Sequence, residues 1–387
     1  MKISNRLLSL ELPASRSAFL WGPRKVGKTY WLTHQYPQVR LIDLLKTDTF
    51  AEYATRPSLL RERCEAWYQR PLVKKGPHLI LDEIQKLPVL LDEVHWLIEN
   101  RGISFLLTGS SARKLKRAHA NLLGGRAWRR VMLPLTLPEI ESFNLNLAMI
   151  SGLLPPHLLS PNPLEDLRSY VADYLKEEVL EEAEEQELPA FSQFLRVAAL
   201  TSGGLLDYTN VGREAGISSL IARRYFDLLE DTFLGFRIPP WRSSKKRRMI
   251  LTEKFYLFDV GLACYLANRS AKPRSPDFGK AFEHFILMEL RAFIHYRRPE
   301  LPICFWRTSS GIEVDFILGE KELAVEIKAS ERVHEGDLKA LVALLEDGKV
   351  KHAVVVCLEP EPRRVSTHIQ ILPWHYFLQG LWNNEWL

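Results

Sequence analysis

The sequence lacks any long apolar run. No stretch approaches the about 18 apolar residues that a membrane-spanning helix needs. The first residues, "MKISNRLLSLELPASRS", also lack the long apolar core of a signal peptide. These absences argue against membrane insertion and secretion, and they predict a cytoplasmic protein with no membrane partner.

Cysteine is scarce as well. The four cysteines, Cys64, Cys264, Cys304 and Cys357, lie far apart and do not have the spacing of metal ligands. This pattern excludes a disulfide framework and a zinc site, and it predicts buried thiols in a reducing compartment. The sequence also has no clear internal repeat and no low-complexity tract.

A large excess of one charge is missing too. The net charge is +5, which is compatible with a nucleic-acid partner but does not establish one. The 387 residues are 46% hydrophobic and 26% charged. This is the composition of a soluble globular chain, and the length predicts two to four domains.

What the sequence does contain is a phosphate-binding loop. "SAFLWGPRKVGKTYWL" predicts a strand, a glycine turn and the start of a helix. In this motif the backbone N–H groups and the helix start hold phosphates, Lys28 adds a cation and the Thr29 hydroxyl binds Mg²⁺. The predicted ATP-binding residues are Gly22, Pro23, Arg24, Lys25, Val26, Gly27, Lys28, Thr29 and Tyr30.

An acid pair follows a second apolar segment, "HLILDEIQ". Ligands of a parallel sheet bind at the carboxyl ends of its strands, so Asp82 is predicted to hold Mg²⁺ and Glu83 to activate the attacking water. Thr108, which ends the apolar segment "ISFLLTGSS", is predicted to orient water against the γ-phosphate, with a plain turn as the alternative. Residues 38–45 predict a further strand between the P-loop strand and the acid-pair strand.

Arginines follow two glycines in "GGRAWRRVMLPL". Arg126, Arg129 and Arg130 include candidates for a γ-phosphate sensor, or for an arginine finger that acts across the interface of a homo-oligomer. The alternative is a solvated basic strand.

The middle of the chain changes character. Residues 150–166 are rich in proline and serine and predict a linker that closes the ATPase core. Two helices separated by Pro189 are expected next, with the acidic run 177–187 on a solvated face. After Leu205, two short helical segments predict a helix-turn-helix in which Thr209 caps the first helix and Ser218 the second.

Extended segments then flank the basic run "KKRR". A helix-turn-helix followed by a basic-tipped hairpin predicts a winged helix that contacts duplex or branched DNA through phosphates. The alternative is a winged helix that docks a protein. The candidate DNA-contacting residues are Arg223, Arg224, Lys245, Lys246, Arg247 and Arg248.

Acidic residues recur in the last part of the chain. Glu283 lies beside the apolar face of a predicted helix, and the segments "IEVDFIL" and "AVEIKAS" predict two strands joined by a turn. Antiparallel pairing would let Asp315 and Glu326 converge on one divalent ion, with Glu283 completing the metal site. Lys328 would position water or stabilise charge. The alternative is a half-exposed sheet whose outer face carries acids and a lysine.

Taken together, these motifs resemble the bacterial and archaeal AAA-type ATP-binding proteins that carry a carboxyl-terminal domain of unknown function. The resemblance rests on "GPRKVGKT", "LILDEIQ", "LLTGSSARKL", "FYLFDVGLACYL", "FEHFILMEL" and "GIEVDFIL…AVEIKAS". It implies an α/β chain with an ASCE-type P-loop core and a parallel sheet, then a winged helix and a PD-(D/E)xK nuclease-like α/β domain. Tyr30 departs from the pattern, because threonine is common at its position.

The expected domains are the ATPase at residues 1–149, a linker and helical region at 150–204, the winged helix at 205–269 and the nuclease-like domain at 270–387. The expected function is Mg²⁺-dependent ATP hydrolysis coupled to DNA, with Mg²⁺ or Mn²⁺ at the nuclease-like site. The catalytic candidates are Lys28, Glu83, Asp315, Glu326 and Lys328. The alternative is an ATP-driven binding switch whose nuclease-like domain is inactive.

Overall fold

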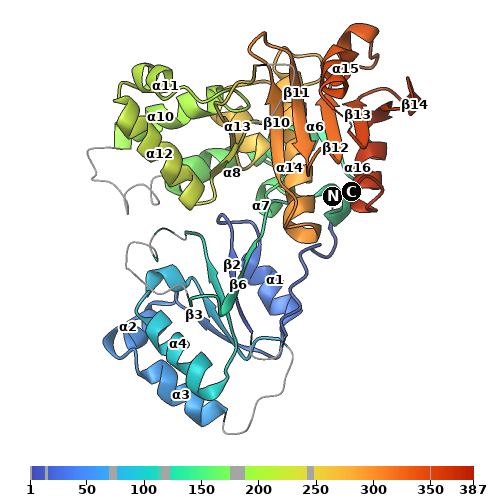
Figure 1. The fold of residues 1–387 in the computed structure, drawn as a ribbon. Helices are drawn as coiled ribbons and strands as arrows, with labels where there is room; N and C mark the ends of the chain where they lie inside the picture. The colour runs from blue at the N-terminus through green and yellow to red at the C-terminus, as the bar shows by residue number, and fades with distance from the viewer. Residues whose placement is uncertain are drawn as a thin grey trace. The chain divides into compact units, whose positions relative to one another are not determined.

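A computed structural model describes residues 2–13, 16–68, 76–111, 113, 115, 123–174, 188–241, 248–348 and 350–387 (Figure 1). The chain divides into two compact units. The P-loop unit holds Arg6–Leu133 and Asp231–Leu234, and the C-terminal unit holds Met1–Asn5, Pro134–Glu230 and Gly235–Leu387. No helix among these residues is long and apolar enough to cross a membrane.

A five-stranded parallel sheet forms the centre of the P-loop unit. Its order is β3 (Arg40–Asp43), β4 (Leu79–Asp82), β5 (Phe105–Gly109), β2 (Ser17–Trp21) and β6 (Ala127–Val131). Every residue of β2, β4 and β5 is buried, as expected for strands covered on both faces. The predicted α/β class with a parallel sheet is therefore confirmed.

One detail of strand order differs from the prediction. The strand between the P-loop strand β2 and the acid-pair strand β4 is β5, whereas β3, which lies within residues 38–45, is at the edge of the sheet. Both strands are short apolar segments, so the sequence pattern did not distinguish their places. The helices of this unit are α1 (Lys28–Gln35), α2 (Thr47–Thr55), α3 (Leu59–Trp67), the 3-10 turn η1 (Ile84–Lys86) and α4 (Leu90–Arg101).

The C-terminal unit begins with helices where a linker was predicted. The helices are α6 (Leu145–Ser151), α7 (Pro155–Leu158) and α8 (Pro163–Ser169), which continues as the π-helix η3 (Tyr170–Tyr174). Leu153 and Leu154 are fully buried. Residues 150–166 are therefore packed structure, and Pro189 lies within the first turn of α10 (Leu188–Leu200). The acidic run 177–187 lies outside the described residues.

The predicted helix-turn-helix segments are helical. They are α11 (Tyr208–Ala215) and α12 (Ser219–Asp231), followed by the antiparallel strands β8 (Gly235–Ile238) and β9 (Lys254–Leu257). Asp207 caps α11 by accepting the N–H groups of Thr209 and Asn210, so the predicted cap at Thr209 is wrong by two residues. Ser218 accepts the N–H of Ile221 at 3.2 Å, as expected of a cap.

The last part of the chain forms a six-stranded mixed sheet (Figure 1). Its order is β10 (Ile303–Arg307), β11 (Glu313–Leu318), β12 (Leu323–Ile327), β13 (His352–Cys357), β15 (Ile369–Pro373) and β14 (Arg363–Arg364). One apolar core joins this sheet to α14 (Phe278–Arg297) and α16 (Trp374–Trp382), and a second joins it to α15 (Lys339–Glu346). The helix α13 (Val260–Leu266) precedes α14, and β1 (Lys2–Ile3) pairs with β7 (Ile140–Glu141).

Candidate functional site

The glycines of the P-loop have backbone conformations that other residues rarely adopt. Gly22 has φ +148°, and a Cβ atom there would lie 2.4 Å from the Met132 carbonyl oxygen. Gly27 has φ +97° and immediately precedes α1. The loop therefore directs the first N–H groups of α1 toward the space where phosphates bind in proteins with this turn.

Lys28 is held in place by the loop itself. Its ammonium donates to the carbonyl oxygens of Gly22 at 2.7 Å and Pro23 at 3.0 Å, and the residue is only 5% exposed. These carbonyls are neutral, and the two hydrogen bonds orient the ammonium at the P-loop. Such a cation is suited to a phosphate.

Arg6 supports the loop from outside the motif. Its guanidinium donates to the Val26 carbonyl oxygen at 2.8 Å and to the Leu133 carbonyl oxygen at 2.5 Å. It therefore ties the P-loop to the residue at which the chain leaves this unit. Sequence reasoning missed Arg6, because it lies well before the motif.

Asp82 meets two hydroxyl groups at the carboxyl edge of the sheet. Thr29 donates to one carboxylate oxygen at 2.8 Å, and Thr108 donates to the other. Burial raises the pKa of Asp82, and the two hydroxyls oppose this effect. The Thr29 hydroxyl and the Asp82 carboxylate are hard oxygen ligands side by side, and this pairing fits Mg²⁺.

Thr108 has a different place from the one predicted. Its hydroxyl donates to Asp82 and accepts the N–H of Glu83 at 3.2 Å, and the residue is fully buried. Thr108 is therefore engaged in positioning the acid pair. The structure gives it no exposed hydroxyl with which to orient a water.

Glu83 has two polar neighbours that the sequence did not reveal. Gln85 donates to its carboxylate, and the Ser110 hydroxyl lies at 3.5 Å from the same oxygen. Gln85 also donates to Ser110 at 3.1 Å. Glu83 has φ +59° and is 8% exposed. The spacing Asp-Glu-x-Gln and the "TGSS" segment were the available signals for this group.

The remaining loop residues lie nearer the surface. Lys25 is exposed with φ +62°, Arg24 is half-buried and Val26 is buried. Tyr30 is 68% exposed and its ring stacks on His34 with centroids 3.9 Å apart. The departure from threonine at position 30 therefore places an aromatic ring in solvent.

Arg126 does not lie at the ATP site of its own chain. It precedes β6, whereas the P-loop follows the carboxyl end of the parallel neighbour β2. At about 3.3 Å per residue, the five-residue strand separates the two edges by about 17 Å. The guanidinium instead pairs with Glu99 at the surface. The predicted role as a sensor in the same chain is therefore wrong, and a role across a subunit interface stays a prediction.

The carboxyl-terminal acids gather where two strands separate. The pairing of β11 with β12 is antiparallel and ends at Phe316↔Val325, one step before Asp315 and Glu326. The Asp315 carboxylate instead accepts the N–H of Ile327 at 2.7 Å. Lys328 lies 2.7 Å from one oxygen of Glu326, while the other oxygen is buried with no hydrogen-bond partner among the described residues. The predicted proximity of Asp315, Glu326 and Lys328 is therefore observed.

A lysine from another element completes this cluster. Lys254 of β9 is 3% exposed; its ammonium pairs with Glu313 and lies 3.8 Å from Glu283. The Tyr256 hydroxyl donates to the same oxygen of Glu283 at 2.6 Å. Sequence reasoning missed Lys254 and Tyr256, because they belong to the predicted wing. We call Lys254, Tyr256, Glu283, Glu313, Asp315, Glu326 and Lys328 the acidic cluster.

Burial and mutual repulsion shape the charges of this cluster. Burial, followed by Glu326 and Glu283, raises the pKa of Asp315 well above its usual value, although Lys254 opposes this. Burial raises the pKa of Glu326 to about 7, and Lys328 opposes that effect. Burial disfavours the charge of Lys254, but the carboxylates around it outweigh burial and raise its pKa.

The expected three-carboxylate metal site is not what these residues form. Across the described ranges, no group of three or more His, Cys, Asp or Glu side chains is arranged to hold a metal ion. The ammonium of Lys254 lies among the carboxylates instead. In this conformation Glu283, Asp315 and Glu326 are therefore not arranged to share one divalent ion, and a metal at this place stays a prediction.

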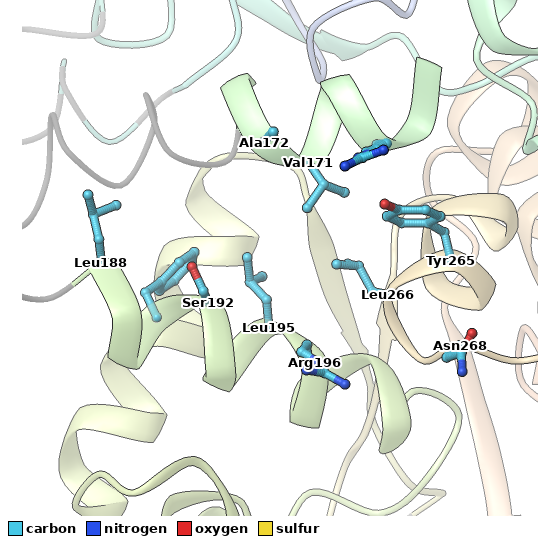
Figure 2. A pocket seen from close by; sticks show the side chains of 11 residues that line it. Val171, Ala172, Leu188, Ser192, Leu195, Arg196, Tyr265, Leu266 and Asn268 are labelled. Carbon is cyan, nitrogen blue, oxygen red and sulfur yellow. The ribbon is translucent and has the colours of Figure 1, made fainter. Parts of the chain in front are cut away.

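The candidate DNA-contacting residues are only partly placed. Arg223 and Arg224 are exposed on α12, and Arg248 is exposed in the connection between β8 and β9. Lys245, Lys246 and Arg247 lie outside the described residues. A separate cavity of about 410 Å³ opens between η3, α10 and α13, where Val171, Leu195 and Leu266 point inward (Figure 2). None of the predicted site residues lines it.

The fold and the site define a P-loop ATPase domain. Residues 14–141 match the family model described as an AAA domain. Two further matches are to domains of unknown function, DUF8612 at residues 143–273 and DUF4143 at residues 278–377. The amino-terminal part therefore has the parallel sheet, the P-loop and the family match of an AAA-type P-loop ATPase domain.

Relatives extend over much of the chain. An uncharacterized protein of Mycobacterium tuberculosis is 25% identical over 260 residues, which is 65% of this chain and 58% of the relative. An uncharacterized protein of Methanocaldococcus jannaschii is 23% identical over 379 residues, covering 90% of this chain and 83% of the relative. The alignment thus spans less than two thirds of the mycobacterial protein. A Walker-type ATPase of Pyrococcus abyssi has a TM-score of 0.42 at 14% identity, over 64% of this chain and 90% of that one.

Proposed function

We propose that this protein is a Mg²⁺-dependent ATP hydrolase whose ATPase cycle is coupled to DNA binding. The observation that carries the ATPase part is the meeting of Thr29, Asp82 and Glu83 beside the P-loop. Thr29 and Asp82 would hold the ion, which neutralises phosphate charge when bound. Lys28 and the N–H groups of the loop would hold the phosphates.

Glu83 is the proposed general base. A carboxylate takes a proton from the attacking water only if it is ionised and within reach of that water. Gln85 and Ser110 hold the Glu83 carboxylate at the carboxyl edge of the sheet, 8% exposed and beside the magnesium ligands. They are therefore positioning residues, and Glu83 is the catalytic one.

Glu83→Gln tests this assignment. The variant should bind ATP with the affinity of the wild type and hydrolyse it about 10² to 10⁴ times more slowly, because only proton removal is lost. Glu11→Gln, at an exposed position of the same unit, is the matched control and should hydrolyse normally. Unchanged phosphate release by Glu83→Gln would remove Glu83 from the mechanism.

DNA is the proposed partner of the C-terminal unit. Exposed Arg223 and Arg224 lie next to each other on α12, the second helix of the predicted helix-turn-helix. In such motifs the second helix lies in the major groove of DNA. The exposed Arg248 follows the basic run and adds to the same charge. Phosphate contacts of this kind bind DNA without sequence preference.

Charge reversal tests the DNA proposal. Arg223→Glu with Arg224→Glu should weaken binding to duplex and branched DNA and reduce the slope of log affinity against log salt by about two. Reversal of the exposed Arg196 and Arg213 outside α12 is the control. If wild-type protein shifts neither DNA at low salt, the alternative in which the winged helix docks a protein is preferred.

Metal-dependent phosphodiester cleavage is a second candidate function. It is favoured by the adjacency of Asp315 to Glu326 and Lys328, and by the buried Glu326 oxygen that has no partner among the described residues. With Mn²⁺ and ATP, cleavage of linear, single-stranded or branched DNA should be lost in both Asp315→Ala and Lys328→Ala. Cleavage by both variants at the wild-type rate would instead indicate a contaminating nuclease.

A further inference from the structure

Lys254 belongs to a different structural element from the two carboxylates with which it pairs. Glu283 lies on α14 and Glu313 on β11, whereas Lys254 comes from β9, which pairs with β8 in the predicted wing. Its ammonium contacts both carboxylates while the residue is only 3% exposed. The two carboxylates offset the cost of burying the charge of this ammonium.

Side-chain cations of the protein already pair with carboxyl groups of the acidic cluster. Four carboxyl groups are present, at Glu283, Glu313, Asp315 and Glu326, and three cations pair with them, Lys254, Lys328 and Arg307. Lys254 and Arg307 share Glu313, and Lys328 pairs with Glu326. Asp315 instead accepts the N–H of Ile327.

A nuclease-like domain would be expected to hold a divalent ion at this place, and the residues present do not fit one. We infer that Lys254 is the resident cation of the acidic cluster and that it excludes Mg²⁺ and Mn²⁺ as long as β9 stays seated. A divalent ion and Lys254 compete for the same carboxylates. Loss of Lys254 from the cluster is therefore the condition for metal binding.

A cavity lies beside Lys254 and its carboxylate partners. This cavity of about 250 Å³ adjoins the cluster and is lined by Lys254, Tyr256, Glu283, Glu313 and the turn around Gly203. It is large enough for an ion with several waters, since a water occupies about 30 Å³. What keeps an ion away from these carboxylates is therefore charge and not a lack of space.

This competition links the hairpin to the cluster. β9 positions Lys254 and also carries the strand pairing with β8, so a shift of the hairpin moves the ammonium away from Glu283 and Glu313. Because the cleavage proposed above needs a metal here, Lys254 would set when that reaction is allowed.

Lys254→Met tests this inference in the full-length protein. Calorimetric titration with Mn²⁺ should show at least tenfold tighter binding by the variant than by the wild type, because the Lys254 ammonium no longer competes for Glu283 and Glu313. Lys280→Met is the matched control: Lys280 is exposed on the wall of the same cavity, and its removal changes the net charge equally. This control should bind Mn²⁺ as the wild type does.

Equal Mn²⁺ affinity in wild type and Lys254→Met would overturn the inference. If Lys254→Met is unfolded in EDTA, circular dichroism replaces calorimetry. Recovery of the folded signal with Mn²⁺ would support the inference, and a chain that stays unfolded would contradict it. Tight Mn²⁺ binding without DNA cleavage would leave the inference standing and remove only the cleavage proposal.

Discussion

Two lysines are buried, Lys28 in the P-loop unit and Lys254 in the C-terminal unit. Their exposed fractions are 5% and 3%. The oxygen atoms that surround their ammonium groups differ in charge. The ammonium of Lys28 contacts carbonyl oxygens, whereas that of Lys254 contacts carboxylates. Carbonyl groups carry no net charge, so they orient a cation without neutralising it. Carboxylates neutralise the cation, so Lys254 is itself the bound ion.

The acids around the two lysines differ in the same way. Asp82 is held by the hydroxyls of Thr29 and Thr108, which satisfy its oxygens without cancelling its charge. Glu313 instead pairs with Lys254 and Arg307. The first arrangement is prepared for a ligand and the second is closed by its own side chains. Carboxylates and a lysine in one place therefore do not by themselves define a metal site.

The largest effect is expected at Lys254. Lys254→Met takes the ammonium away from the half-buried Glu283 and Glu313, of which Glu313 keeps Arg307, and the free energy of local opening should fall by about 3 to 5 kcal/mol. Hydrogen exchange of the β11 and α14 amides measures that opening. Lys280→Met should change it by less than about 0.5 kcal/mol. A loss of that smaller size in Lys254→Met would mean that the pair contributes little.

The second effect concerns Lys28. Lys28→Ala removes the ammonium that the P-loop carbonyls orient, and kcat/KM for ATP should fall by about a thousandfold. Stability should change less than in Lys254→Met, because the carbonyl oxygens that Lys28 contacts are neutral. Steady-state phosphate release and thermal unfolding check the two halves of this expectation. Lys46→Ala, exposed at the start of α2, is the control.

A third prediction uses pH. Burial raises the pKa of Glu326 from its ordinary 4.5 to about 7. Between these values the folded chain holds a proton that the unfolded chain has released, so this group lowers stability as pH rises from 4.5 to 7. The effect is at most about 3 kcal/mol. Glu326→Gln should therefore show a flatter decline in local opening free energy than the wild type, and parallel pH curves would contradict the assignment.

The smallest effect is expected at Gln85. Its amide donates to Glu83, and the loss of one such hydrogen bond should lower kcat by about tenfold. The apparent affinity for ATP should stay the same, because Gln85 touches the base and not the P-loop. Gln85→Ala and the exposed control Gln38→Ala can be compared by full kinetic curves. A rise in KM with unchanged kcat would argue against a positioning role.

The sequence predicted well what consecutive residues determine. The P-loop, the acid pair and the strand pair of Asp315 and Glu326 each lie within one short segment, and the parallel sheet followed from buried apolar strands. Arg6 and Lys254 could not be found in this way. Arg6 reaches Val26 from 20 positions away, and Lys254 reaches Glu313 from 59 positions away. Such contacts depend on the tertiary fold.

Prolines produced a separate error. Pro155 and Pro163 suggested a linker, yet each lies at the first position of a helix, α7 and α8. Pro189 suggested a break and lies in the first turn of α10. Proline is favoured at such positions, because its fixed φ suits a helix and its missing N–H would have no partner there. A proline in a sequence can therefore mark either the end or the start of a helix. In residues 150–166, the burial of Leu153 and Leu154 shows that the segment is packed structure and not a linker.

Phe233 is synthesised late but packs against a strand of the P-loop unit that is synthesised early. This residue returns to the P-loop unit from the end of α12, with φ +60°, and its ring stacks on Trp21 of β2 at 6.2 Å. It leaves the ribosome about 100 residues after Leu133, hence about 5 to 20 s later. During that interval the nascent ATPase sheet lacks the ring that covers Trp21. A chain that ends before Phe233 would keep that tryptophan uncovered permanently, and it would be expected to need a chaperone where the full chain does not.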